Sequence, residues 1–300
     1  MELHATSHAP SPARPTDDEI DLFGLTHQGH RRANNQDHFL IATIHAEIKV
    51  KGTSLAGISE LPLLGNRLGT VLLVADGVGG TNDGGAAARL ATESVMQYVA
   101  TSLRCYHEMG SGSDPRFLSS LREAAVRAHE AVLAEAVTRP DHSSLATTLT
   151  LGIGVWPWLY VVQVGDSRAY IYSGKRLVQV TRDQTMAQEM LDIGALTPAD
   201  MPRSPLNDIL SSAIGAEQAS PEVSRVDVSE RGCVLLFCTD GLTKHVTNGE
   251  IESFCARGLS AEDLARSLVN LALDRGGSDN VTIVVAQAPV KARSSATTPP

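Results

Sequence analysis

The sequence predicts an α+β fold in which two mostly antiparallel β-sheets pack on each other and helices cover both outer faces, an α-β-β-α sandwich. Three observations predict it. Short apolar runs follow one another through tight turns, as antiparallel strands do. Two long helical patterns interrupt these runs. Further helix start signals stand near the end of the chain, so both outer faces of the sheets are expected to be covered.

The expected strands are short and rich in β-branched residues. Leu149, Leu151 and Ile153 alternate with Thr and Gly, which is the period of a strand with one buried face, and Ser173-Gly174 marks a hairpin turn. The Gly-rich stretch 52–69 is expected to be a loop. The expected strands are 21–26, 37–48, 70–75, 146–155, 159–164, 169–173, 176–181, 223–228, 233–239 and 280–286.

The first two helices are expected at 84–104 and 115–138, the second opened by Pro115 at its first position. Thr247 and Ser260 each precede an acidic residue three positions on, the spacing of a capping box or a related cap, so each is expected to begin a helix. Paired helices inserted among antiparallel strands indicate sheets covered on their outer faces.

Composition limits the class of protein. The 300 residues are 42% hydrophobic with a mean hydropathy of -0.05, which is typical of a globular chain and too polar for a membrane bundle. No apolar run could span a bilayer, and the first residues lack the order of a secretion signal, so we expect a cytoplasmic protein without membrane contact. A net charge of -9 argues against a nucleic-acid partner.

Residues 1–19 and 289–300 are rich in Pro, Ser, Thr and Ala without periodicity, and we expect both to be disordered tails. Between them no repeat or long linker interrupts the chain, which favours one domain over residues 20–288. The four cysteines form no C-x-x-C pair, so neither a disulfide frame nor a zinc site is expected.

Acidic residues stand at the ends of four expected strands. Asp76 and Asp240 each follow an apolar run and precede a glycine, Asp166 follows Gly165 after another run, and Asp279 precedes a strand. In an antiparallel sandwich these positions can share one edge. Packed carboxylates repel one another unless a cation lies among them, and oxygen ligands select hard ions such as Mg²⁺ or Mn²⁺. Asp-Gly is also a common turn signal, so a simple turn remains the alternative at each place.

These segments, taken in order, resemble the metal-dependent protein phosphatase family, also called protein phosphatase type 2C, and specifically a bacterial stand-alone catalytic domain. Each block is weak alone, but five in the family's order are specific. The blocks are Arg32-Ala33-Asn34-Asn35-Gln36-Asp37, Asp76-Gly77-Val78-Gly79-Gly80, Gly165-Asp166-Ser167-Arg168-Ala169-Tyr170, Thr239-Asp240-Gly241-Leu242 and Gly277-Ser278-Asp279-Asn280.

The resemblance implies a serine/threonine protein phosphatase that uses two Mn²⁺ or Mg²⁺ ions, with a third held more loosely. It implies that Asp76 bridges the two ions, that the Gly77 carbonyl binds one of them, and that Asp240 and Asp279 bind the other. A metal-activated hydroxide would then attack the phosphoester. The resemblance further implies that Asp37 holds metal-bound water and that Asp166 helps Asp240 to bind the third ion.

Arg32 matches the family's phosphate-binding arginine, and a planar guanidinium suits bidentate contact with phosphate. Its neighbour Arg31 is the competing candidate, but the spacing to Asn35 and Asp37 favours Arg32. The broken helical segment 184–215 resembles the family's flap, which borders the active site, although a passive connector is the alternative.

Three positions bear on how far the resemblance extends. Gln36 stands where many relatives have Glu, and Val78 stands where eukaryotic members carry a His that protonates the leaving group. His245 is the one histidine close to a motif, and we expect it to take no part in the chemistry.

The implied partners are phosphorylated Ser/Thr proteins, including a bacterial protein kinase or its substrates, and the implied state is a monomer. Two other functions stay open. One is a non-catalytic module that binds a partner through its flap. The other is a two-metal hydrolase of nucleic acid or of small phosphoesters, and the acidic net charge argues against nucleic acid as its substrate.

Overall fold

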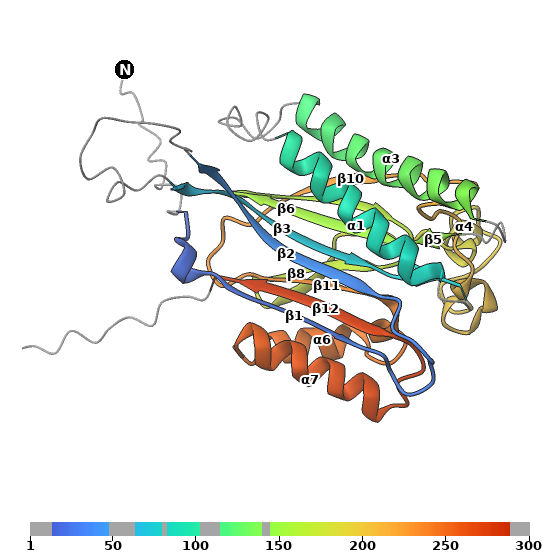
Figure 1. Ribbon diagram of the computed structural model, residues 1–300. Coiled ribbons are helices and arrows are strands. Elements are labelled where there is room, and N and C mark those ends of the chain that lie inside the picture. The colour runs from blue at the N-terminus through green and yellow to red at the C-terminus, as the bar shows by residue number, and fades with distance from the viewer. Residues whose placement is uncertain (1–13, 48–63, 80–82, 103–114, 140–144, 289–300) are drawn as a thin grey trace, which may run out of the picture.

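The computed structural model describes residues 14–47, 64–79, 83–102, 115–139 and 145–288. Two five-stranded sheets lie face to face, with α1 and α3 on one outer face and α6 and α7 on the other (Figure 1). The expected α-β-β-α sandwich is therefore confirmed. No helix in the described ranges has both the length and the apolar character needed to cross a membrane.

The first sheet has the strand order β1-β12-β11-β8-β9, and every neighbouring pair is antiparallel. It joins the two ends of the domain, because β1 pairs along its whole length with β12. Its strands are β1 (Asp21–His27), β8 (Arg168–Ser173), β9 (Arg176–Gln179), β11 (Val234–Cys238) and β12 (Val281–Gln287).

The second sheet has the order β10-β7-β6-β3-β2 and is also antiparallel throughout. A two-stranded ladder of β4 (Gly77–Val78) and β5 (Ala146–Thr147) extends it at one end. Its strands are β2 (His38–Glu47), β3 (Leu64–Ala75), β6 (Leu149–Val155), β7 (Trp158–Val164) and β10 (Glu222–Asp227).

Helices α1 (Asp83–Thr101) and α3 (Pro115–Thr138) pack on each other and on the second sheet. Helices α6 (Asn248–Cys255) and α7 (Ala261–Asp274) cover the first sheet, and their expected caps are confirmed: Thr247 and Ser260 accept hydrogen bonds from the first turns. The short helix α5 (Asp240–Thr243) directly follows β11. The segment after β9 holds α4 (Met186–Asp192), η3 (Met201–Arg203) and η4 (Pro205–Asp208).

Alternation along the strands divides the core into three layers. In β3, Val71 and Leu73 face the helices, whereas Leu72 and Val74 face the opposite sheet. Because side chains alternate between faces with a period of two, Asp76 continues the row of Leu72 and Val74 into the space between the sheets. The strand pattern thus directs this carboxylate inward.

Some expected boundaries were wrong: β9 ends at Gln179 and not at residue 181, and the expected strand 146–155 is divided into β5 and β6. Of the stretch 52–69, expected to be a loop, residues 52–63 lie outside the described residues, and the rest is strand: β3 begins at Leu64 and pairs with β2, with register shifts on either side of His45. In addition, residues 14–19 are part of the structure, with Asp17–Glu19 forming η1. The rest of the expected tails, residues 1–13 and 289–300, lies outside the described residues.

Candidate active site

The structure brings the four strand-end aspartates together around one open cavity of about 650 Å³. Asp76, Asp166, Asp240 and Asp279 all line it, and so do Gly77 and Arg32 from the sequence prediction. Two further polar side chains that line it, Lys244 and His245, come from the segment after α5. Acids that lie as far as 203 positions apart in the numbering, at 76 and 279, therefore share one site.

Strand direction explains this convergence. Strands β3 and β11 end at Ala75 and Cys238, directly before the segments that carry Asp76 and Asp240, whereas β12 begins at Val281, just after Asp279. In antiparallel pairs the end of one strand lies beside the start of its neighbour. Strands β11 and β12 form such a pair, so Asp240 and Asp279 lie at one end of the first sheet, and Asp76 lines the same cavity from the end of β3 in the second sheet.

The glycines after Asp76 and Asp240 are not turn glycines. Gly77 lies in β4 and Gly241 in α5, and neither has a positive φ. Each allows a close approach instead: a Cβ on Gly241 would lie 1.8 Å from the Asn280 carbonyl oxygen, and one on Gly77 would lie 2.3 Å from the Gly84 carbonyl carbon. The turn alternative is wrong at these two positions, because the glycines let backbone segments pack at the site.

Asp37 is buried beside the cavity rather than lining it. Its Oδ2 accepts hydrogen bonds from the Thr239 and Thr282 hydroxyls at 2.9 and 2.7 Å. Burial raises the pKa of Asp37 to about 7; the two hydroxyls oppose the rise, and the charges of Asp240 and Asp279 add to it. Burial therefore favours the protonated form of this carboxyl relative to an exposed aspartate.

Asp76 and Asp166 also have a pKa well above the usual range. The largest cause is burial, and the next is a neighbouring carboxylate, Asp37 for Asp76 and Asp240 for Asp166. Both side chains keep some exposure to the cavity, yet the protein around them removes enough water to disfavour their charge. Such mutual repulsion is relieved by a cation.

Two carboxylate oxygens are left for a ligand. Oδ1 of Asp37 and Oδ1 of Asp240 are buried and have no hydrogen-bond partner within the described part of the chain. Buried polar atoms are normally paired, so orphaned carboxylate oxygens beside a cavity point to a missing electropositive partner. An all-oxygen donor set of this kind fits a hard divalent ion such as Mg²⁺ or Mn²⁺.

Two basic side chains hold the acids in this structure. Arg32 donates from Nε and Nη2 to the two oxygens of Asp279 at 2.6 and 2.7 Å, and Lys244 donates from Nζ to Asp279 Oδ2 at 2.9 Å. Burial would raise the pKa of Asp279, but these bonds outweigh it and lower the pKa. Over the described residues, no three acidic, His or Cys side chains form a ready metal-binding group.

Sequence reasoning missed Lys244 and the hydroxyls that support the acids. Lys244 stands four residues after Asp240 across a short helix, a spacing at which opposite charges meet, so the signal was present. The Thr148 hydroxyl accepts from the Asp76 backbone amide, and nothing in the sequence marks this distant threonine. His245, expected to take no part in the chemistry, accepts a hydrogen bond from the Ser278 backbone amide at 3.0 Å. This hydrogen bond stabilises the loop that carries Asp279.

The expected flap borders the cavity, because Asp208 and Leu210 line it. Thr185 and Leu210 form a β-bridge, and Ser211 donates from its amide to the Gln184 carbonyl, so the two ends of the segment close on each other. Gln184 in turn accepts from the Gly165 amide, next to Asp166. The segment therefore lies beside the acids, which is the position expected of a flap, and its role stays a prediction.

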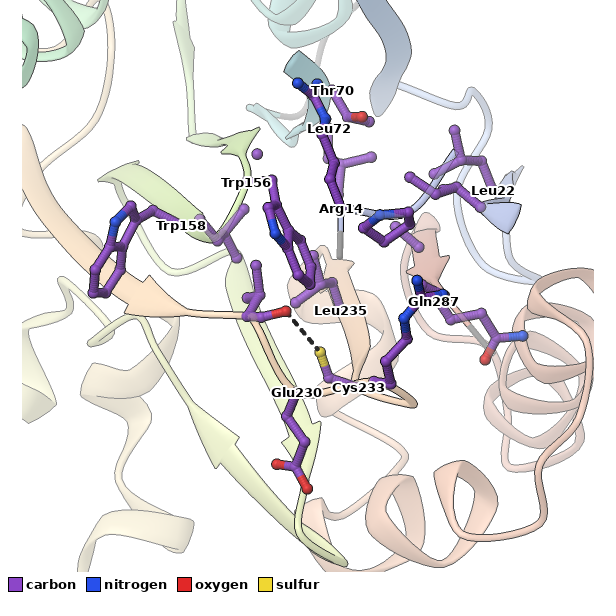
Figure 2. A pocket seen from close by; sticks show the side chains of 18 of the residues that line it. Arg14, Leu22, Thr70, Leu72, Trp156, Trp158, Glu230, Cys233, Leu235 and Gln287 are labelled. Atoms are coloured by element: carbon purple, nitrogen blue, oxygen red, sulfur yellow. Dashed lines mark hydrogen bonds between the residues drawn. The ribbon is translucent and has the colours of Figure 1, made fainter. Parts of the chain in front are cut away.

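A second cavity, of about 90 Å³, lies at the other end of the sandwich. Figure 2 shows apolar side chains around it: Leu72 from β3, Leu235 from β11 and Trp156 from the turn between β6 and β7. The carboxylate of Glu230 points away from it and bonds to Ser173. No carboxylate cluster faces this cavity among the residues that line it, so we assign the chemistry to the first one.

Comparison with known proteins finds similar sequences among the protein phosphatases. Residues 65–273 match the family model described as protein phosphatase 2C. The serine/threonine protein phosphatase PstP of Mycobacterium tuberculosis is 32% identical over 220 residues, which cover 72% of this chain but 40% of that protein. The chain thus spans less than half the length of this relative. The protein phosphatase PhpP of Streptococcus pneumoniae is 28% identical over 273 residues, 89% of this chain and 96% of its own.

Solved structures resemble the whole fold. The crystal structure of M. tuberculosis PstP/Ppp has a TM-score of 0.69 at 27% identity, covering 90% of this chain and 99% of its own. The PstP catalytic domain in complex with two manganese ions has a TM-score of 0.68 at 26% identity, with the same coverage of 90% and 99%.

Proposed function

Because the chain belongs to the protein phosphatase 2C family, we propose that it is a metal-dependent phosphatase acting on phosphoserine and phosphothreonine in proteins. The observation that carries this proposal is the meeting of Asp76, Asp166, Asp240 and Asp279 with Arg32 around one open cavity. Carboxylates that hold cations and an arginine that binds phosphate are the parts that phosphoester hydrolysis needs.

Asp76, the Gly77 carbonyl, Asp240 and Asp279 would hold two Mn²⁺ or Mg²⁺ ions, and Asp166 with Asp240 would hold a third. The PstP catalytic domain, solved in complex with two manganese ions, supports the proposal of two ions in a fold of this kind. When bound, such ions acidify a water molecule and neutralise charge on the phosphoryl group.

The protein's own groups would hold the water and the substrate. Asp37 keeps Oδ1 unpartnered in the described residues while two threonine hydroxyls fix its Oδ2, so it can accept a hydrogen bond from water in a set orientation. Arg32 has 47% of its side chain exposed at the cavity, where its planar fork can turn from Asp279 to a phosphate. Val78 lines the same cavity and offers no proton to the leaving group.

The substrates we propose are phosphorylated proteins, including a bacterial protein kinase or its targets. We assign catalysis to a single domain of about residues 20–288 acting as a monomer, with 184–215 as the flap beside the cavity. Since kinases use ATP inside the cell, we place the protein in the cytoplasm.

The test is hydrolysis of p-nitrophenyl phosphate and of a phosphothreonine peptide by metal-stripped protein. We expect activity only after Mn²⁺ or Mg²⁺ is added, and its loss in excess EDTA. Asp76→Asn removes the charge that would bridge the ions, so we expect a loss of about 1,000-fold or more, because metal ions supply several kcal/mol of transition-state stabilisation.

Asp227→Asn is the matched control, since Asp227 lies at the end of β10, does not line the cavity, and accepts a local hydrogen bond from the Ser229 amide. It should keep full activity. Circular dichroism should show that both variants are folded. Activity that persists in EDTA would refute the proposal, and a folded wild-type protein that binds no Mn²⁺ would favour the non-catalytic alternative.

A further inference from the structure

Lys244 lies at the centre of the acidic cluster. Its Nζ is 2.6 Å from Asp240 Oδ2 and 2.9 Å from Asp279 Oδ2, and 3.9 Å from Asp208 Oδ1 on η4. Its side chain is 31% exposed, and those of Asp240 and Asp279 are 20% and 13% exposed. The ion pairs are thus partly shielded from water, which makes them stronger than surface pairs.

The same carboxylate oxygens are the ones a divalent ion would need. Asp279 already accepts bonds from Arg32, Lys244 and the Asn280 amide, which is 2.9 Å from its Oδ1. Asp240 has Oδ2 occupied by Lys244, and its Oδ1 alone is unpartnered in the described residues. An ion shared by Asp240 and Asp279 therefore competes with the ammonium for both side chains.

Resting on the metal site proposed above, we propose that Lys244 is a built-in counter-ion: it holds Asp240 and Asp279 together in the metal-free protein, and it must release them before a divalent ion binds between them. Removing one partner of a shielded ion pair normally leaves an uncompensated charge that destabilises the fold. Here Lys244 stabilises the empty site and lowers the apparent affinity for metal.

Geometry on the backbone supports this role. Lys244 follows the four-residue helix α5, so its side chain lies on the same side of this helical turn as that of Asp240. Its backbone amide donates a hydrogen bond to the Asp240 carbonyl at 2.8 Å. A lysine has a flexible stem and three donors, so it can leave its carboxylates without moving the backbone. Metal binding then needs only a side-chain rotation.

The first test is calorimetric titration of Mn²⁺ into metal-stripped wild type, Lys244→Met and Lys175→Met. Lys175 is a hairpin residue between β8 and β9 and controls for the change in net charge. We expect Lys244→Met to bind Mn²⁺ about tenfold more tightly at one site or more, and to melt at a lower temperature without metal. Lys175→Met should match the wild type. An affinity for Lys244→Met that is unchanged or weaker would overturn the proposal.

The second test separates displacement of Lys244 from simple repulsion between its charge and the ion. Wild-type protein is acetylated with an N-hydroxysuccinimide ester, with and without Mn²⁺, and the modified lysines are quantified by mass spectrometry. Displacement predicts that Mn²⁺ increases labelling of Lys244 about threefold or more relative to Lys175 in the same sample. If Mn²⁺ binds and this ratio stays constant, Lys244 is not displaced and the proposal is wrong.

The two experiments also distinguish this inference from the function it depends on. If neither wild type nor Lys244→Met binds Mn²⁺, the metal site and the phosphatase assignment both fail. If both bind Mn²⁺ with equal affinity and are active, the phosphatase assignment stands and only the role of Lys244 is refuted.

Discussion

The two ends of one sandwich differ in chemistry although the same strands build them. At one end, the segments that flank β3, β11 and β12 present Asp76, Asp240 and Asp279 to an open cavity. At the other end, residues of the same strands, Leu72, Leu235 and Ala286, line a small apolar cavity (Figure 2). Seven residues of β12 separate the two, about 23 Å at the usual strand rise.

This difference shows where stability and function reside. Between the ends, the inter-sheet layer is apolar and almost fully buried, as Leu72, Leu159 and Phe237 show. At the acidic end, several aspartates have a raised pKa, which means that the fold disfavours their charged forms. The apolar end and the layer behind it are therefore expected to support the fold, whereas the acidic end costs stability that a bound cation restores.

Leu159→Ala should have the largest effect on stability and little on the site. Leu159 is 1% exposed, begins the inter-sheet row of β7 and lines the apolar cavity. Truncating a buried leucine usually removes about 2–5 kcal/mol. Urea unfolding should show this loss, with the affinity of the folded protein for Mn²⁺ unchanged. A parallel drop in Mn²⁺ affinity would show that the two ends are coupled.

Arg32→Ala should reduce catalysis by about 10- to 100-fold, because it removes a charge-assisted, bidentate contact to phosphate. The loss should appear in kcat/KM for p-nitrophenyl phosphate at saturating Mn²⁺. Arg31→Ala is the matched control: the neighbouring arginine does not line the cavity and should leave kcat/KM unchanged. Equal losses in both variants would remove Arg32 from the phosphate site.

The pH dependence of the metal-free protein should give the smallest effect. Asp37 has a pKa of about 7 in the fold, above the value of an unfolded aspartate, so its contribution to stability is full below about pH 4 and is lost as pH rises through 7. Thermal melting in EDTA should therefore show a fall of about 1 kcal/mol or more over this range.

Asp37→Asn should make that slope smaller, because an amide does not titrate. The exposed residue Asp18, in η1, provides the control Asp18→Asn, which should retain the wild-type slope. Asp76 and Asp166 act in the same direction as Asp37, and Asp279, whose pKa is lowered, opposes them. A wild-type protein that becomes more stable from pH 4 to 7 would contradict this assignment.

Much of the fold could be predicted because its signals are local. The helix Pro115–Thr138 has the bounds expected from a proline at its first position, and Thr247 and Ser260 cap the helices they were expected to begin. The start of β3 could not be predicted, since the pairing of Leu64 with Glu47 depends on a partner strand rather than on local propensity.

The sequence by itself determined the layered α+β architecture and the set of acids at strand ends, because alternation, capping and residue order are written along the chain. Only the tertiary structure decided that Gly77 and Gly241 serve close packing, that Asp37 is buried under two threonine hydroxyls, and that Lys244 shares the carboxylates. The physical reason is that burial, and with it each group's electrostatic environment, depends on neighbours brought together from distant parts of the chain.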